Sequence, residues 1–233
     1  MDLVKKRRRV IGGNWKMYKD PAGTTSFFDR FRPLVERSGH CEIVICPSFL
    51  DVQNAVAGAH GTRIKIGAQN LYWADEGAFT GEVSGPMIRA SGCSHVIVGH
   101  SERRRYFGET NESVLKKTVA ALDSGLTPIV CIGGREKKNV EAVLAEQFRC
   151  GIGGLSAGQF TKIVIAYEPV WRLVPARPPR PRSPPMLTSS FALKRSAVSE
   201  QTRQITSASY TAAASSPTMQ RVFRRSLKLT GFL

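Results

Sequence analysis

The octapeptide HVIVGHSE, at residues His95–Glu102, carries the clearest indication of this chain's architecture. It begins with a Val- and Ile-rich run that lacks a clean polar alternation, which is typical of a strand covered on both faces, as in a parallel sheet. Polar side chains follow as soon as that run ends. Further runs of the same character occupy Arg9–Gly13, Glu42–Cys46, Arg63–Gly67, Thr127–Ile132 and Lys162–Tyr167. With His95–Gly99 they predict six parallel strands.

Stretches with helical spacing lie between several of these runs. They are Thr24–Val35 (with Phe27, Phe28, Phe31 and Leu34), Glu112–Leu122 (with Val114, Val119 and Leu122) and Val140–Phe148 (with Val140, Val143, Leu144 and Phe148). Six strand-and-helix steps in the first 171 residues amount to about 28 residues per step, enough for right-handed parallel crossovers. Such a pattern fits either an open doubly wound sheet or a closed barrel.

The absence of nucleotide-binding motifs favours the barrel. Neither GxGxxG nor GxxxxGK[ST] occurs, which weakens the interpretation of the chain as a nucleotide-binding Rossmann or P-loop fold. Eight units of this length would need roughly 225–250 residues, the usual size of a (β/α)8 barrel. We therefore predict an α/β fold of this type, with about six units encoded in residues 1–171.

The net charge of +16 is unevenly distributed over the 233 residues. Residues 1–171 hold 23 Lys and Arg against 17 Asp and Glu, whereas residues 172–233 hold 11 against one. Glycine also changes there, since 20 of the 21 glycines precede residue 172. We predict a barrel domain over 1–171 and a separate basic, Pro-, Ser- and Arg-rich tail over 172–233. A basic excess ordinarily suggests a nucleic-acid partner, and such a tail is one alternative.

Composition excludes some other classes of protein. A 42% hydrophobic content excludes a wholly disordered chain, and no apolar run is long enough to predict a membrane helix. The KKRRR leader lacks the apolar stretch of a signal peptide and is interpreted as a solvated lead-in to the first strand. Five cysteines without a CxxC pair suit a reduced, cytoplasmic protein with buried thiols.

Candidate catalytic groups follow the predicted strands. Because a (β/α)8 barrel places its active site at the C-terminal strand ends, polar side chains at those ends are the candidates. Asn14 and Lys16 follow the first strand, His100 the fourth and Glu168 the sixth. A base, an imidazole, a cation and an amide would form an acid–base site for a small anionic substrate. The alternatives are a surface cation at Lys16, a core histidine at His100 and a strand cap at Glu168.

Several motifs, in order and in spacing, resemble those of triosephosphate isomerases. They are GGNWKM (12–17), GAQN (67–70), GAFTGEVS (77–84), VIVGHSERRRYFGE (96–109), VCIGG (130–134) and AYEPVW (166–171). The resemblance covers residues 9–171. It implies interconversion of dihydroxyacetone phosphate and glyceraldehyde 3-phosphate through an enediolate, in glycolysis and gluconeogenesis, with no cofactor or metal. It also implies a homodimer, and no membrane or nucleic-acid partner is expected.

The resemblance implies a role for each candidate. Glu168 would be the base and His100 a neutral electrophile, kept neutral by the helix that begins beyond it. Lys16 would supply fixed positive charge, while Asn14 would bind substrate. Two supporting residues would be Glu102, paired with Lys16, and Gln69. The loop of residues 69–85 resembles the family's dimer loop, with Thr80 near its tip.

The sequence departs from the family pattern at Tyr18, where the family usually has Asn, and at Gly134, where it usually has an acid. After Trp171 the family pattern is lost entirely. The lid motif AxGTGxxA, the phosphate loop YGGSV and the turn GGASL, expected with strands seven and eight, do not occur. Permitted codons for Arg172–Arg182, read one frame over, translate as LGTGKTATPE. The same offset turns Ser209–Leu233 into a segment containing LYGGSV. We therefore expect a one-base deletion just after codon 171. The 233-residue chain should then have impaired activity or be an inactive truncated barrel.

Overall fold

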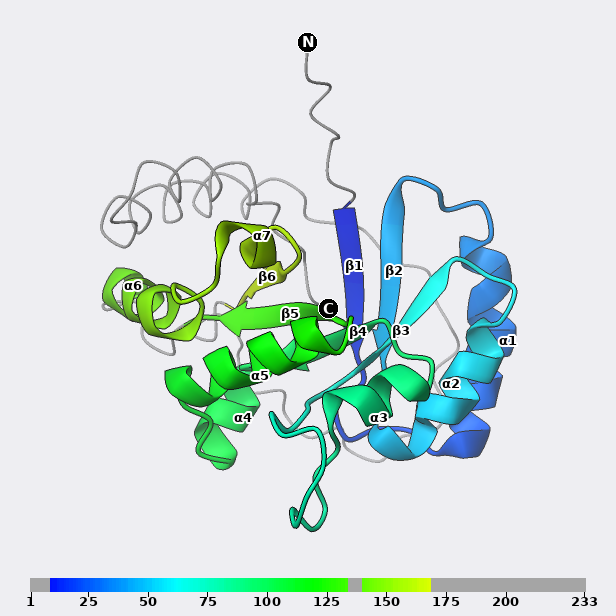
Figure 1. Cartoon of the computed structure of the whole chain (residues 1–233). Coiled ribbons are helices and arrows are strands. Elements are labelled where there is room, and N and C mark those ends of the chain that lie inside the picture. The colour runs from blue at the N-terminus through cyan, green and yellow to red at the C-terminus, as the bar shows by residue number, and fades with distance from the viewer. Residues whose placement is uncertain (1–8, 134–139, 169–233) are drawn as a thin grey trace, which may run out of the picture.

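The computed structural model describes residues 9–133 and 140–168, which contain a single parallel β-sheet (Figure 1). Within these residues the strand order is β1-β2-β3-β4-β5-β6, so each strand lies beside its neighbour in sequence. The strands are β1 (Arg9–Asn14), β2 (Cys41–Cys46), β3 (Ile64–Ala68), β4 (His95–Val98), β5 (Thr127–Ile132) and β6 (Val164–Tyr167). All six predicted strands are therefore confirmed, with ends within two residues of the expected ones.

Helical segments connect successive strands. They are α1 (Pro21–Val35), the 3-10 turn η1 (Phe49–Asp51), α2 (Val52–Ala59), α3 (Gly85–Ala90), α4 (Ser101–Tyr106), α5 (Asn111–Asp123), α6 (Val140–Gly151) and α7 (Ala157–Phe160). The sheet curls strongly, so that β1 runs upright and β5 runs across the view in Figure 1. This is the arrangement expected for part of a (β/α)8 barrel.

Local sequence fixes where the main helices begin. The Asp20 carboxylate accepts a hydrogen bond from the Gly23 N–H (2.7 Å), and Pro21 occupies the first turn of α1. At α5, Thr110 and Ser113 bond each other's backbone N–H groups in a capping box. These caps set the start of helices that then lie along the sheet.

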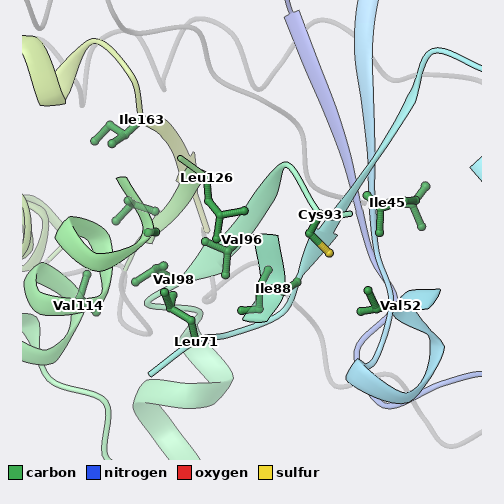
Figure 2. Packing of buried hydrophobic residues seen from close by; sticks show 14 of the residues in the cluster. Ile45, Val52, Leu71, Ile88, Cys93, Val96, Val98, Val114, Leu126 and Ile163 are labelled. Atoms are coloured by element: carbon green, nitrogen blue, oxygen red, sulfur yellow. The ribbon is translucent and has the colours of Figure 1, made fainter. Parts of the chain in front are cut away.

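Two apolar clusters occupy opposite faces of the sheet. The larger one joins alternate strand residues to the helices, and Figure 2 shows Val96, Val98, Ile88 and Val114 converging within it. The smaller one consists of the intervening strand residues, with Val44, Ile97, Ile129 and Ala166 among its members. Burial on both faces explains why the strands read as continuous apolar runs.

Helix periodicity identified the core faces incompletely. Phe28 is 1% exposed and packs in the larger cluster, but Leu34, at the end of the same predicted stripe, is 79% exposed. On α5 the polar side chains of Lys117 and Thr118 are buried beside Val114. Among the described residues, no helix is long and apolar enough to cross a bilayer. The predicted tail, 172–233, and Gly134 lie outside the described residues.

Candidate active site

The C-terminal ends of the parallel strands bring the predicted polar residues to one edge of the sheet. Asn14 is the last residue of β1, and the Trp15 N–H extends the β1–β2 pairing by donating to the Cys46 carbonyl (3.0 Å). Glu168 follows β6 and donates its N–H to the Ile132 carbonyl (2.8 Å). His100 lies two residues beyond the end of β4. The backbone at the end of β1 and at Glu168 is thus tied to a neighbouring strand.

His100 and Glu168 form a direct side-chain contact. The imidazole Nε2 lies 2.8 Å from Glu168 Oε1, and the two side chains are only 10% and 13% exposed. The second carboxylate oxygen, Oε2, accepts a hydrogen bond from the Ser101 N–H (2.9 Å). A basic oxygen and an imidazole therefore face each other in a poorly hydrated position, where electrostatic interactions are strong.

The hydrogen-bond pattern assigns the tautomer of His100. Its Nδ1 accepts from the Glu102 N–H (3.2 Å), one of the free donors in the first turn of α4. An accepting Nδ1 carries no proton, so the neutral ring has its proton on Nε2. Nε2–H consequently donates to Glu168 and is placed to donate to another oxygen at the same position.

Lys16 reaches the same site through Glu102. Its Nζ lies 2.7 Å from Glu102 Oε1, and Glu102 Oε2 lies 3.5 Å from His100 Nδ1. Both partners of the Lys16–Glu102 pair are more than 40% exposed, so this pair adds little to stability. Its effect is to hold an ammonium group beside the imidazole.

The backbone of Lys16 is unusual and is supported from two sides. Its φ of 54° lies in the left-handed region, which is uncommon for a non-glycine residue. The Lys16 N–H donates to Asn14 Oδ1 (2.9 Å), and Gln69 Nε2 donates to the Lys16 and Cys46 carbonyls (2.9 Å each). Asn14 and Gln69 therefore hold the lysine in place.

The pKa of Glu168 is lowered from its ordinary value of 4.5. Burial by itself raises this pKa, but the hydrogen bond from His100, the electrostatic attraction of that ring and the hydrogen bonds from Ser101 stabilise the carboxylate and outweigh the burial. The carboxylate is therefore ionised at neutral pH, the state that a general base needs.

Cys131, the next-to-last residue of β5, interacts electrostatically with this carboxylate. Burial, reinforced by the charge of Glu168, raises the pKa of its thiol well above the ordinary value of 9.0. A protonated, buried thiol is a poor nucleophile. Among residues 9–133 and 140–168, no group of three or more His, Cys, Asp or Glu side chains is arranged to hold a metal ion.

Comparison with known proteins connects this geometry to a family. The family model described as "Triosephosphate isomerase" matches residues 9–220. The chain belongs to the triosephosphate isomerase family. The triosephosphate isomerase of Solibacter usitatus is 64% identical over 171 residues, which are 72% of this chain and 69% of that protein. The one from Moorella thermoacetica is 47% identical over 171 residues, 72% of this chain and 68% of that protein.

A solved structure agrees with these sequence matches. Triosephosphate isomerase from Bartonella henselae superposes with a TM-score of 0.64 at 34% identity, covering 71% of this chain and 69% of that one. The predicted fold class and the resemblance to triosephosphate isomerases are thereby confirmed. The roles of individual residues are taken up below as proposals.

Most predicted site residues lie together, and one lies apart. Lys16, His100, Glu102 and Glu168 form a connected chain of contacts, with Asn14 and Gln69 directly behind Lys16. Thr80 is exposed in the loop before α3, which projects away from the sheet in Figure 1. Its predicted role in a dimer loop stays a prediction.

Sequence reasoning missed two residues that contact this site. Ser101 contributes a backbone N–H to Glu168, which follows from its place in the first turn of a helix, where N–H groups lack intrahelical partners. Glu109 accepts a hydrogen bond from the Gly99 N–H (3.0 Å) at 8% exposure. No periodic signal identifies Glu109, because it lies in the loop between α4 and α5.

Proposed function

We propose that this chain interconverts dihydroxyacetone phosphate and glyceraldehyde 3-phosphate, with Glu168 as the base. The observation that carries the proposal is the 2.8 Å contact between Glu168 Oε1 and His100 Nε2, with Lys16 joined to the same group through Glu102. An ionised carboxylate, a neutral N–H donor and a fixed cation are what proton transfer beside a carbonyl requires.

Each side chain has a distinct part in the proposed reaction. Glu168 removes a proton from the carbon next to the substrate carbonyl, and the negative charge moves onto the carbonyl oxygen. The His100 Nε2–H donates to that oxygen, while Lys16 stabilises the enediolate and attracts the phosphate. The proton of the hydroxyl on the first carbon moves to the former carbonyl oxygen, a transfer for which the His100 Nε2–H is placed, and Glu168 then returns the abstracted proton to the neighbouring carbon. Substrate binding must replace the His100–Glu168 hydrogen bond with bonds to substrate.

The role of Glu168 is tested by its isosteric amide. Glu168→Gln should lower kcat by about 10²- to 10⁴-fold, the usual contribution of a general base, because the amide cannot accept the proton. Deuterium incorporation into substrate in D2O, followed by ¹H NMR, reports the same step directly. Glu141→Gln, an exposed change on α6, is the matched control and should leave both rates unchanged. Unchanged exchange in Glu168→Gln would exclude this carboxylate as the base.

The role of Lys16 is tested by removing its charge. Lys16→Met should lower kcat/KM by about 10²- to 10³-fold, as expected for loss of one group that stabilises developing negative charge. Lys162→Met, an exposed lysine next to β6 at the opposite end of the sheet, is the control. Equal, small effects of the two substitutions would contradict a specific role for Lys16.

We also propose that two copies associate through the loop of residues 69–85. The loop carries Trp73 and Phe79, which are 38% and 43% exposed, and Met17 (94%) and Tyr18 (72%) follow β1. Such a set of exposed apolar side chains is costly in a monomer. Phe79→Asp should shift the mass measured by sedimentation from dimer to monomer, whereas Leu50→Asp, on another exposed apolar residue, should not. A monomeric parent chain would contradict this proposal.

We infer that residues 172–233 are translated from a shifted reading frame. The support is the change in composition at Trp171, the restored lid and phosphate-loop motifs at one offset, and matches to curated relatives that cover 72% of the chain. Resequencing the DNA around codon 171 tests the inference. An intact upstream frame with no missing base would exclude it.

A further inference from the structure

Charged side chains hold both peptide groups that flank Gly99, the residue before His100. The Gly99 N–H donates to Glu109 Oε2 (3.0 Å), and the Gly99 carbonyl accepts from Arg104 Nε (2.8 Å). Hydrogen bonds to ionised groups are shorter and stronger than neutral ones. The backbone that carries His100 is thus fixed by an anion on one side and a cation on the other.

Gly99 also has no room to move. Its φ of +75° lies in the left-handed region, and a Cβ built on it would lie 3.0 Å from Val114 Cγ2 and 3.2 Å from the Cys131 carbonyl oxygen. The first condition favours glycine, and the second requires it. The direction of the backbone after β4 is therefore fixed, and this direction determines where His100 lies.

The two charged residues are themselves anchored. Lys117 on α5 hydrogen-bonds Glu109 Oε1 and donates to Asn70 Oδ1 (2.8 Å), and both Lys117 and Glu109 are less than 10% exposed. Arg104 Nη1 donates to Asn111 Oδ1 (2.7 Å) at the start of α5. The contacts to Gly99 are thereby braced against α5 and the loop after β3.

We propose that Glu109 and Arg104 are positioning residues that act on catalysis through the Gly99 backbone and His100. This proposal rests on the function proposed above. The imidazole must donate to an oxygen on which charge develops, and such donors are effective only within a fraction of an ångström of the correct place. A shift of His100 therefore weakens transition-state stabilisation more than substrate binding, so kcat falls while KM changes little.

A purely structural role for the same charges makes a different prediction. Buried ion pairs often contribute little net stability, yet removing one partner leaves an uncompensated charge and destabilises the fold. In that case the folded fraction of a variant would have normal kcat and an unchanged imidazole. Stability measurements alone cannot separate the two roles. The ¹⁵N chemical shifts of the His100 ring can, because only a positioning role changes them.

The test compares Glu109→Gln and Arg104→Lys with Glu112→Gln in the 233-residue chain and in the chain from a frame-restored gene. The amide keeps one acceptor oxygen and loses the charge, while lysine keeps the charge and loses the Nε donor to Gly99. Glu112 is an exposed acid in a surface ion pair on α5 and is the matched control. The readouts are kcat and KM per folded protein, and the ¹⁵N chemical shifts of the two His100 ring nitrogens.

We expect kcat to fall about 10- to 100-fold in both Glu109→Gln and Arg104→Lys, with KM within about twofold. Small misplacements of a catalytic group have effects of this size. The His100 ¹⁵N shifts should move in both and stay unchanged in Glu112→Gln. Lower stability with unchanged kcat and unchanged ¹⁵N shifts would overturn the proposal. If Glu109→Gln does not fold, Arg104→Lys decides alone. Because the shifts need no turnover, they test the positioning role even in a 233-residue chain of low activity. A frame-restored chain without isomerase activity would refute the proposed function and still leave the positioning role measurable.

Discussion

At the scale of single residues, the pair His100–Glu168 determines how this site responds to pH. The pKa of Glu168 is lowered because the hydrogen bonds to its carboxylate outweigh burial, which acts in the opposite direction. The lowered pKa is therefore a product of its neighbours. Removing one neighbour should reveal the effect of burial.

Replacing His100 by Ala is predicted to raise the pKa of Glu168, because burial remains while a hydrogen bond that lowers it is lost. The carboxylate should then take up its proton at a higher pH than in the parent chain. A ¹³C NMR titration of the Glu168 side-chain carboxyl measures this shift. His60→Ala, at an exposed histidine, is the control and should change nothing. An unchanged or lower pKa in His100→Ala would contradict the assigned hydrogen bond.

Two glycines allow backbone strain to be separated from crowding. Gly99 and Gly61 have nearly equal φ values, +75° and +74°, but a Cβ on Gly61 would meet nothing within 4 Å. Gly61→Ala should cost about 1–2 kcal/mol for the left-handed conformation alone. Gly99→Ala should cost about 1–3 kcal/mol more, because the methyl group overpacks Val114 and Cys131. Equal losses in the free energy of unfolding, measured by urea titration, would show that crowding at Gly99 is unimportant.

The sequence predicts the reactive residues better than those that hold them. Lys16, His100 and Glu168 stand out because they are polar residues directly after apolar strands. Glu109 lies in a loop and Arg104 in a short helix, and both segments are rich in charged residues. The sequence alone does not distinguish a buried charged side chain there from a solvent-exposed one. Their partners come from α5 and the loop after β3, and only the fold brings those segments together.

At the scale of secondary-structure elements, strands are predicted well and short helices poorly. A strand of β-branched residues buried on both faces leaves a continuous apolar run that needs no periodicity to be recognised. By contrast, α2 and α3 are short, and their buried residues include Ala55, Ala59 and Gly85. Small residues pack closely against the sheet but give almost no hydrophobic contrast, so these helices were not predicted.

The start of β4 carries a buried histidine that makes stability depend on pH. His95 is 4% exposed, Ser94 Oγ lies 2.9 Å from its Nδ1, and Glu42 Oε1 lies 3.8 Å from its Nε2. Burial lowers its pKa below the ordinary value of 6.5, Lys65 adds to this, and Glu42 opposes both. The folded chain therefore resists protonation of His95 more than the unfolded chain does.

The sign of the resulting pH dependence follows from linkage. Below about pH 6.5 the unfolded state binds a proton that the folded state does not, so the free energy of unfolding falls as the pH falls towards the lowered pKa. His95→Asn should flatten this part of the stability–pH profile, measured by urea unfolding at several pH values. His40→Asn, at an exposed histidine, should leave the slope intact. An unaltered slope in His95→Asn would assign the dependence to other groups.

At the scale of the whole molecule, the described sheet is open. Among the described residues β1 pairs only with β2, and β6 only with β5, so each has an edge without a strand partner there. Open edges and the apolar faces beside them favour aggregation. If residues 172–233 come from a shifted frame, the 233-residue chain should be poorly soluble. Size-exclusion chromatography beside a frame-restored chain tests this, and two equally monodisperse proteins would contradict it.

The most direct test of this interpretation is the steady-state isomerase rate on glyceraldehyde 3-phosphate, measured with a dehydrogenase-coupled assay. It compares the 233-residue chain, the chain from a frame-restored gene, and Glu168→Gln in that restored chain. We expect ordinary enzymatic turnover only in the restored chain, a rate far lower in the 233-residue chain, and a loss of about 10²- to 10⁴-fold in Glu168→Gln. A restored chain without activity, or one that Glu168→Gln leaves fully active, would contradict the proposed catalytic site.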